Sequence, residues 1–221
     1  MSSFILKDLC YSYENNENEV ISNMNYEFID KTVYSIVGKS GAGKTTLLSL
    51  LSGLAKPTKG SIMFDGKDIS KLDSYKYRSN LVGVIFQSFN LLPHLTAVEN
   101  VILSMDISGK NIQNKKEKAL ELLKNVGLDE AISNRRILKL SGGEQQRVAI
   151  ARTLSYDPAV ILADEPTGNL DGETQSSIIE ILKKLAREDG KCVILVTHSP
   201  EVAKMSDVVY ELSSKKKTLV S

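Results

Sequence analysis

The chain has 221 residues, of which 42% are hydrophobic and 25% are charged, the composition of an ordinary globular domain with a full core. The formal net charge of +1 gives no bulk basicity that would indicate a nucleic-acid partner. No uninterrupted apolar run approaches the ~18 residues that a membrane span needs, and the N-terminal residues lack the pattern of a signal peptide. The two cysteines, Cys10 and Cys192, lack metal-like spacing, so we expect reduced thiols and a cytosolic compartment.

The first predicted elements are strands. Residues 3–11 and about 20–29 read as two strands separated by the polar loop 14–19, and we interpret them as a small antiparallel sheet. Tyr13 lies at the lip of this loop. The pattern alone favours an ordinary strand-edge tyrosine, and the alternative is an aromatic ring that stacks on a purine base.

A glycine-rich stretch from Gly38 to Thr46, with the sequence GKSGAGKTT, fits the pattern GxxxxGK(S/T). The β-rich run 32–37 precedes it and the apolar run 45–54 follows it, so a strand and a buried helix flank the loop as the motif requires. The glycines let successive N–H groups point at phosphates, and the helix adds the positive end of its dipole. We expect Lys44 to reach the β- and γ-phosphates and Thr45 to ligate Mg²⁺. A solvated surface loop is the alternative, but four fixed positions recur by accident in only roughly one chain in a hundred.

Two further strands are predicted after the first helix. Residues 61–64, followed by Asp65-Gly66, predict a strand that runs into a tight hairpin turn. Residues 81–86 predict a strand that ends at Gln87. A glutamine just past a buried strand that faces a phosphate loop is well placed to hold a metal ion or a water, although it says little by itself.

Helices are predicted between Gln87 and the next glycine-containing stretch. Residues 97–105 have helical character, and residues 115–126 place their apolar side chains on one face with charges opposite. Gly127 is a typical residue for the end of the second helix. We interpret the lysines of this helix as a solvated face.

The second unusual stretch runs from Leu140 to Thr153 and begins with LSGGE. Ser141 is a good N-cap, and an amphipathic helix is expected from Glu144 onward. Gly142 and Gly143 allow close backbone approach. Because a helix N-terminus without side chains attracts anions, the stretch predicts an anion contact.

Two acidic residues follow a buried strand. Residues 159–163 are continuously apolar, as in a parallel sheet, and end in Asp164-Glu165. Burial of two acids costs free energy unless they meet a cation or hydrogen-bond donors. We expect Asp164 to hold the Mg²⁺ that Thr45 also binds and Glu165 to polarise a water for in-line attack. Two acids that merely cap a helix are the disfavoured alternative.

The last elements repeat this strand-to-site arrangement. The turn 169–172 leads to a helix over 173–188, and the apolar run 192–196 predicts a buried strand that ends at Thr197-His198. His198 at this position is either a satisfied core-edge histidine or, as we favour, a γ-phosphate contact. The tail 213–221 is short and contains three lysines, for which solvation is a safer interpretation than contact with anionic lipid.

In this order, the pieces resemble the nucleotide-binding subunit of ATP-binding cassette (ABC) transporters over essentially the whole chain. One position departs from the family pattern. The stretch Leu140 to Glu144 corresponds to the family's signature motif, whose fifth residue is often Gln and is Glu144 here. The change leaves Ser141 and Gly143 untouched, so we expect it to alter contacts between two copies of the domain rather than activity. The matching motifs are Walker A at Gly38 to Thr46, the Q-loop Gln87, the signature at Leu140 to Gly143, Walker B ending in Asp164, the adjacent Glu165, the D-loop at Asn169 to Asp171 and the switch histidine His198.

The resemblance implies an α/β fold of the P-loop (RecA-like) type, with a mostly parallel sheet flanked by helices. One nucleotide-binding domain, 1–221, would carry an N-terminal antiparallel β subdomain and an inserted α-helical subdomain at about 88–145. The implied activity is ATP hydrolysis with ATP and Mg²⁺, in which Glu165, His198 and Gln87 are catalytic. Mg²⁺ would be held by Thr45, Gln87 and Asp164. The implied nucleotide contacts are Tyr13, Gly38, Ser40, Gly41, Gly43, Lys44, Thr45, Thr46, Ser141, Gly142, Gly143 and Asp171.

The family also implies partners. Two copies would close head to tail around two ATP molecules, each held by Walker A of one copy and by Ser141 to Gly143 of the other. A separate membrane permease would bind at the cytoplasmic face of the membrane, and no nucleic acid is expected. We interpret Phe89, Leu91 and Leu92, which have no obvious core role in the sequence, as the permease dock.

Within the family, FQSFNLLPHLTAVENV together with LSGGEQQRVAIAR is similar to the MacB and LolD-type group, whose members export peptides, lipoproteins or antimicrobial compounds. A relative of this group regulates a membrane complex in cell-wall remodelling or division without transport, and that alternative stays open. A soluble ABC protein on ribosomes or DNA fits less well, because the chain has one cassette and no sustained heptads. A P-loop kinase or GTPase is disfavoured by the LSGG stretch, Gln87 and His198.

Overall fold

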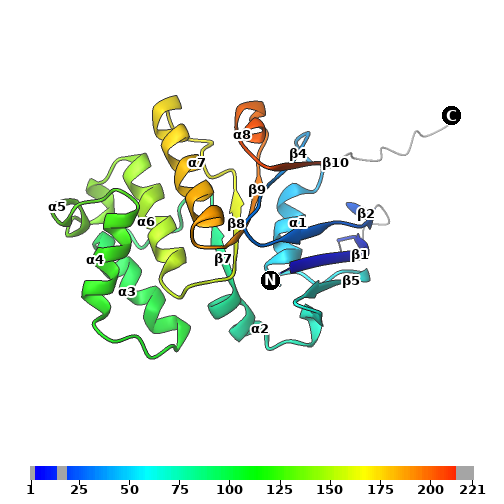
Figure 1. Ribbon diagram of the computed structural model, residues 1–221, viewed down its shortest axis with the longest axis horizontal. Coiled ribbons are helices and arrows are strands. Elements are labelled where there is room, and N and C mark those ends of the chain that lie inside the picture. Colours follow the sequence, from blue (N-terminus) through cyan, green and yellow to red (C-terminus); the bar gives the residue numbers. More distant parts are fainter. Residues whose placement is uncertain (1–2, 14–18, 213–221) are drawn as a thin grey trace.

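The computed structural model describes residues 3–13 and 19–212. Most of the polar loop 14–19 and the whole of the tail 213–221 lie outside the described residues, so the interpretations of both segments stay predictions. A parallel sheet stands in the middle of the molecule, with an antiparallel sheet at one end and a group of helices at the other (Figure 1). This arrangement confirms the predicted α/β class with an antiparallel β unit at the N-terminus.

The parallel sheet has the strand order β10-β4-β9-β8-β7. Each neighbouring pair in this order is parallel, so the carboxyl ends of all five strands lie at one edge of the sheet. Ligands bind outside such an edge in open α/β sheets. The four strands that the sequence predicts here are confirmed, and the strands are β4 (Val33–Gly38), β7 (Val82–Ile85), β8 (Val160–Asp164), β9 (Cys192–Val196) and β10 (Val208–Leu212).

The antiparallel sheet is built around β1 (Ser3–Tyr11). The predicted single strand at about 20–29 is in fact two strands, because Leu9 of β1 pairs with Met24 whereas Phe4 pairs with Phe28. The predicted hairpin is confirmed, with Asp65 and Gly66 both at positive φ between two paired strands. The remaining strands of this sheet are β2 (Ile21–Met24), β3 (Glu27–Ile29), β5 (Lys59–Phe64) and β6 (Lys67–Asp68).

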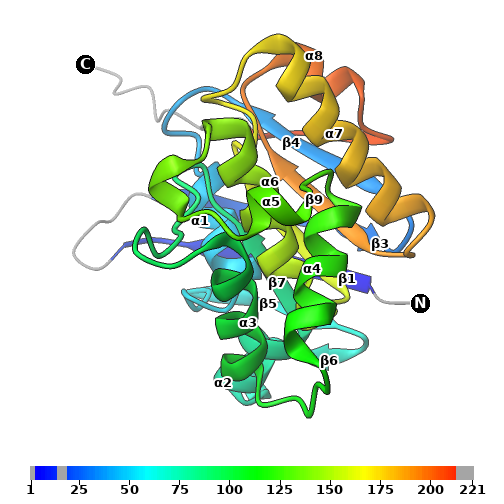
Figure 2. The same cartoon turned by 90° about the vertical axis from the view of Figure 1, so that its left-hand side faces the viewer.

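Two hydrophobic cores cover the two faces of the parallel sheet. One core lies between the sheets, where the buried leucines of α1 (Lys44–Leu51) pack with Ile36 and Ile194 on one side and with Phe4 and Phe64 on the other. The second core lies on the opposite face, where Ile161 and Val193 meet the longer helices (Figure 2). These helices are α3 (Ala97–Ser108), α4 (Lys115–Asn125), α6 (Gly142–Leu154) and α7 (Gly172–Arg187), and the short helix α5 (Glu130–Ser133) packs beside them through Ile132.

Short helical turns complete the chain. The polar stretch 68–79 forms the 3₁₀ turn η1 (Ile69–Lys71) and α2 (Ser74–Lys76) and enters the π-helical turn η2 (Tyr77–Leu81). The 3₁₀ turn η3 (Ile137–Lys139) precedes the signature stretch, and α8 (Pro200–Lys204) follows His198. None of the helices in the described part of the chain is long and apolar enough to cross a bilayer.

The start of α6 differs from the prediction. The helix begins at Gly142, two residues before the expected Glu144, because Ser141 and Glu144 form a reciprocal capping box. The Ser141 N–H donates to Glu144 Oε2 at 2.7 Å, and the Glu144 N–H donates to Ser141 Oγ at 3.3 Å. Both glycines of the signature therefore belong to the first turn of the helix.

The stretch 88–145 contains α3, α4, α5, η3 and the first turn of α6. That this stretch forms a separate subdomain stays a prediction. The interpretation that Leu91 has no core role is wrong, because its side chain is partly buried and packs against the second core. Leu92 remains 48% exposed, so the apolar surface after Gln87 is smaller than the sequence indicates.

Candidate functional site

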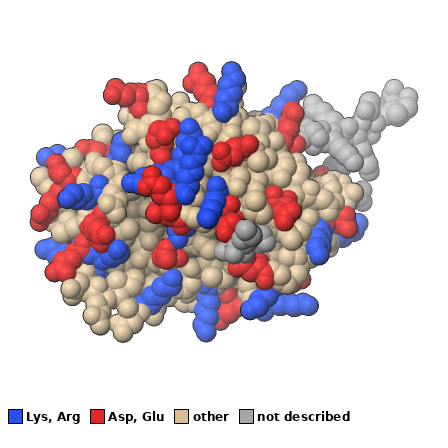
Figure 3. Space-filling view, in the orientation of Figure 1, with Lys and Arg blue, Asp and Glu red and all other residues tan. Residues whose placement is uncertain are grey.

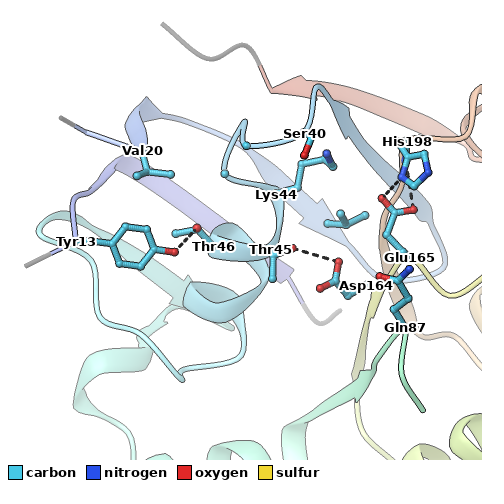
Figure 4. Close-up of a pocket in the computed structure, with 13 residues that line it drawn as sticks. Tyr13, Val20, Ser40, Lys44, Thr45, Thr46, Gln87, Asp164, Glu165 and His198 are labelled. Carbon is cyan, nitrogen blue, oxygen red and sulfur yellow. Dashed lines mark hydrogen bonds and ion pairs between the residues drawn. The ribbon is translucent and has the colours of Figure 1, made fainter. Parts of the chain in front are cut away.

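A cavity of about 690 Å³ opens at the carboxyl edge of the parallel sheet (Figure 4). The loop between β4 and α1 forms one wall, and side chains that follow β7, β8 and β9 form the other. The register explains this convergence, because Asp164, the last residue of β8, pairs with Val196, the last residue of β9. The lining residues are Tyr13, Val20, Ser40, Gly41, Gly43, Lys44, Thr45, Thr46, Gln87, Asp164, Glu165, Val196 and His198.

The glycine-rich loop holds its lysine against its own backbone. Lys44 Nζ donates hydrogen bonds to the carbonyl oxygens of Gly38, at 2.8 Å, and Lys39, at 3.2 Å. Gly41 and Gly43 have φ of 77° and 94°, a region that favours glycine, and Gly43 is the N-cap of α1. The ammonium group and the helix N-terminus thus face the same space, and this arrangement favours an anion.

Thr45 and Asp164 bring two oxygen donors together. Thr45 Oγ1 donates to Asp164 Oδ1 at 3.5 Å. The pKa of Asp164 is raised above its usual value, mainly by burial and further by the negative charge of Glu165. The hydrogen bond from Thr45 and the positive charge of Lys44 lower the pKa in part. A half-buried carboxylate beside a second carboxylate is stabilised by a cation.

These donors fit Mg²⁺, which prefers hard oxygen ligands and is usually bound by one or two carboxylates together with substrate phosphates. The hydroxyl of Thr45, the carboxylate of Asp164 and the amide of Gln87 all line the cavity. Among the described residues no group of three or more His, Cys, Asp or Glu is arranged to hold a metal ion. A metal in this cavity would therefore depend on phosphate oxygens as additional ligands.

Glu165 is held by His198. His198 Nδ1 and Glu165 Oε1 share a hydrogen bond of 2.6 Å, and the His198 N–H donates to Glu165 Oε2 at 3.4 Å (Figure 4). Glu165 has φ of 45°, which is uncommon for a residue with a Cβ, and its N–H donates to the Val196 carbonyl. Such strained positions cluster at functional sites, where the surrounding structure fixes them. Here the strain aims the carboxylate into the cavity.

Tyr13 lies at the far end of the cavity from His198 (Figure 4). Its hydroxyl shares a hydrogen bond of 2.9 Å with Thr46 Oγ1, and its ring meets Tyr11 edge-on at 5.1 Å between centroids. The side chain is 52% exposed, so an aromatic face is available to a base.

Two residues that line the cavity, Val20 and Val196, were not predicted from the sequence. A single valine before a strand and a valine within a buried strand give no signal of a site.

Five of the predicted nucleotide contacts do not line this cavity. The carbonyl of Gly38 instead positions Lys44, and Asp171 caps α7 by accepting hydrogen bonds from the N–H and the hydroxyl of Thr174. A Cβ on Gly143 would lie 2.6 Å from Thr174 Cγ2, so this glycine permits close packing between the starts of α6 and α7. The other two predicted contacts outside the cavity are Ser141 and Gly142.

Comparisons with known proteins agree with this geometry. The profile described as "ABC transporter" matches residues 21–168. YclH of Bacillus subtilis, an ABC transporter ATP-binding protein, is 43% identical over 213 residues, which cover 96% of this chain and 94% of the relative. MJ0796 of Methanocaldococcus jannaschii, with the same description, is 41% identical over 214 residues, which cover 93% and 91%.

Two solved structures of MJ0796 have the same fold. The dimeric structure of this ABC transporter cassette superposes with a TM-score of 0.85 at 40% identity and covers 95% of this chain and 94% of that chain. Its post-hydrolysis dimer bound to ADP and Pi superposes with a TM-score of 0.86 at 39% identity and the same coverage. The profile match and these relatives show that the chain belongs to the ABC transporter family, as an ATP-binding subunit with ATPase activity.

Proposed function

We propose that this ATPase is the energy-providing subunit of an ABC transporter and drives a separate membrane permease. One observation carries the proposal: Lys44, Asp164, Glu165 and His198 meet in one cavity, whereas the signature residues 141–143 lie outside it. The chain thus contains both parts of a family nucleotide site, but the two parts do not meet within one copy.

The cavity supports a role for each lining residue. The backbone of the loop and Lys44 would bind the phosphates. Thr45, Gln87 and Asp164 would hold Mg²⁺, and oxygens of these phosphates would complete its coordination. Glu165 accepts a proton from the attacking water, and electrostatic stabilisation of the transferred phosphoryl group is the main remaining requirement. His198 contacts the γ-phosphate and positions Glu165. Tyr13 stacks on the adenine ring.

A second copy of the chain would complete each site. The N-terminus of α6, with Ser141, Gly142 and Gly143, offers N–H groups and a dipole to the γ-phosphate held by the partner copy. Asp171, at the adjacent start of α7, would lie at the same interface. The dimeric form of the relative MJ0796 supports this arrangement. ATP then favours the closed dimer and hydrolysis weakens it, so nucleotide state biases a two-state assembly.

The permease would bind the surface near the segment that follows Gln87. Leu54, 62% exposed, and Phe86 line a groove of about 240 Å³ beside β7, and Leu92 is 48% exposed in the next loop. Figure 3 shows acidic and basic side chains interspersed over one face of the molecule. The ATPase would then sit peripherally at the cytoplasmic face of the membrane.

Within the family, the proposal extends to the MacB and LolD-type group, on the similarity of the segment from Phe86 to Val101 and of the stretch Leu140 to Arg152. The cargo would be a peptide, a lipoprotein or an antimicrobial compound. Transport by such a complex would be driven by the opening and closing of the ATPase dimer.

Capture of the partner tests the proposal. Tagged Glu165→Gln protein, in which hydrolysis should stop with ATP bound, is purified with ATP from gently solubilised membranes, and its companions are identified by mass spectrometry. A Lys44→Ala protein, in which ATP binding should be weakened, serves as the control. Recovery of a multi-span membrane protein with a large extracytoplasmic domain would support the exporter, whereas ribosomal or DNA-bound companions without a membrane protein would contradict it.

A further inference from the structure

The segment just after Gln87 has an unusual backbone. Phe89 and Asn90 have φ of 59° and 50°, so two consecutive residues with a Cβ occupy the left-handed region. This region is unfavourable for such residues and is visited mostly by glycine and, to a lesser degree, by asparagine. A phenylalanine here requires contacts from elsewhere in the fold that hold it in place.

Arg152, near the end of α6, supplies these contacts. Its Nη2 donates to the Phe89 carbonyl at 3.0 Å, and its Nη1 donates to the Asn90 carbonyl. The planar guanidinium group presents two donors in a fixed fork, which matches two neighbouring carbonyls in a way that a lysine cannot. Burial lowers the pKa of Arg152, and the salt bridges among the described residues do not include it. This partly buried cation therefore has the two loop carbonyls as its hydrogen-bond acceptors.

The same helix carries the signature residues at its other end. From Gly142 to Arg152 the helix rises about 15 Å, and a continuous α-helix transmits displacement as a rigid body. The loop after Asn90 is also tied to the segment that leads into α6. The Ala97 N–H donates to the Arg135 carbonyl at 3.0 Å, and the Ile137 N–H donates to the Leu95 carbonyl at 3.1 Å.

We propose that Arg152 is a positioning residue for ATP hydrolysis, which clamps the left-handed Phe89–Asn90 turn to α6 and thereby fixes Gln87 relative to the signature residues. The clamp rests on the proposed function, in which Gln87 holds Mg²⁺ and the signature closes the site of a second copy. Arg152 itself lies outside the nucleotide cavity. Its effect on turnover passes through Gln87, whose position relative to α6 the clamp fixes.

Arg152→Lys tests the clamp, because it keeps the charge but removes the fork. We expect kcat for ATP to fall at least tenfold, whereas the affinity of the monomer for a fluorescent ATP analogue stays within twofold, since the phosphate loop is untouched. Arg147→Lys is the matched control. Arg147 lies on the same helix, and its guanidinium group donates to the Val126 carbonyl and to Ser177 Oγ, neither of which belongs to the turn. This variant should keep the wild-type kcat.

A second variant breaks the turn without changing α6. Asn90 is exposed, and Asn90→Pro cannot adopt a positive φ and disfavours the left-handed region at Phe89 as well. It should show the same loss of kcat with a normal melting temperature. Because Arg152 acts through Gln87, the double variant Arg152→Lys with Gln87→Ala should be no more than twofold slower than Gln87→Ala alone.

The outcomes separate the clamp from the function on which it rests. A kcat within twofold of wild type for Arg152→Lys or Asn90→Pro, or multiplicative losses in the double variant, would overturn the clamp while leaving the ATPase dimer intact. If wild-type protein neither hydrolyses ATP nor dimerises with it, the proposed function fails and the clamp fails with it.

Discussion

Glu165→Gln replaces the carboxylate of the proposed base with an amide of the same shape. The amide oxygen keeps an acceptor for His198, whose Nδ1 lies 2.6 Å from Glu165 Oε1, and the strained backbone at φ of 45° does not change. The variant therefore removes charge and basicity and leaves the geometry of the cavity as it is. Lys44 and the glycine-rich loop, which we propose to bind the phosphates, do not contact the altered group.

The expected loss of rate follows from the role of a general base. Proton transfer by a positioned base contributes about 10²- to 10⁴-fold to the rate, or about 3–5 kcal/mol in the activation free energy. ATP affinity should be unchanged or higher, because the variant removes a negative charge that faces the γ-phosphate. With hydrolysis blocked, the ATP-bound dimer should accumulate.

Phosphate release at saturating Mg-ATP measures the rate, and light scattering with and without ATP measures the dimer. Glu188→Gln is the control, because Glu188 is exposed at the end of α7 and its Oε2 lies 3.7 Å from Lys184 Nζ, away from the cavity residues. It should hydrolyse ATP at the wild-type rate. A Glu165→Gln rate within tenfold of wild type would remove Glu165 from the role of base, and loss of ATP binding in this variant would refute the assignment of separate binding and catalytic groups.

Three further variants test the site and the core. Lys44→Ala should weaken ATP binding roughly 10- to 150-fold in a fluorescence titration, because a charged hydrogen bond contributes about 1.5–3 kcal/mol, and Lys56→Ala in an exposed turn should not. Asp164→Asn should raise the melting temperature of the nucleotide-free protein. Because the pKa of Asp164 is raised on folding, wild type loses stability relative to this variant as pH rises from about 4, and scanning calorimetry across pH follows the difference. Gln146→Met should stabilise the fold by about 1–3 kcal/mol in urea unfolding, since neither polar atom of this fully buried amide has a hydrogen-bond partner among the described residues.

Each of these has a contrary result. Normal ATP affinity in Lys44→Ala would count against the phosphate-loop assignment as a whole. A stability difference for Asp164→Asn that does not change with pH would show that burial of the charge is not its cause. A loss of stability in Gln146→Met would mean that the amide is satisfied in the folded protein after all.

Features that depend on residues close together in the chain could be predicted from the sequence. The glycine-rich loop needs only its own glycines and the strand and helix beside it, so Gly38 to Thr46 could be assigned without a structure. The capping box of α6 depends on Ser141 and Glu144, which are three residues apart, and the N-cap Ser141 was predicted correctly. The prediction that the helix begins at Glu144 was wrong, because the first turn begins at Gly142. Asp164 and His198 were found because each follows a buried strand, and parallel strands bring their carboxyl ends to one edge.

Contacts between segments that are distant in the sequence could be seen only in the folded structure. The pairing of β8 with β9 places Glu165 against His198, and no pattern within either segment states that register. The left-handed Phe89–Asn90 turn is held by Arg152 of α6, more than sixty residues away in sequence. The partial burial of Leu91 depends on its packing against the second core. Side chains in such places take their conformation from long-range packing rather than from their neighbours in the chain. For the same reason the separation of Ser141 to Gly143 from the cavity, on which the need for a second copy rests, became visible only in three dimensions.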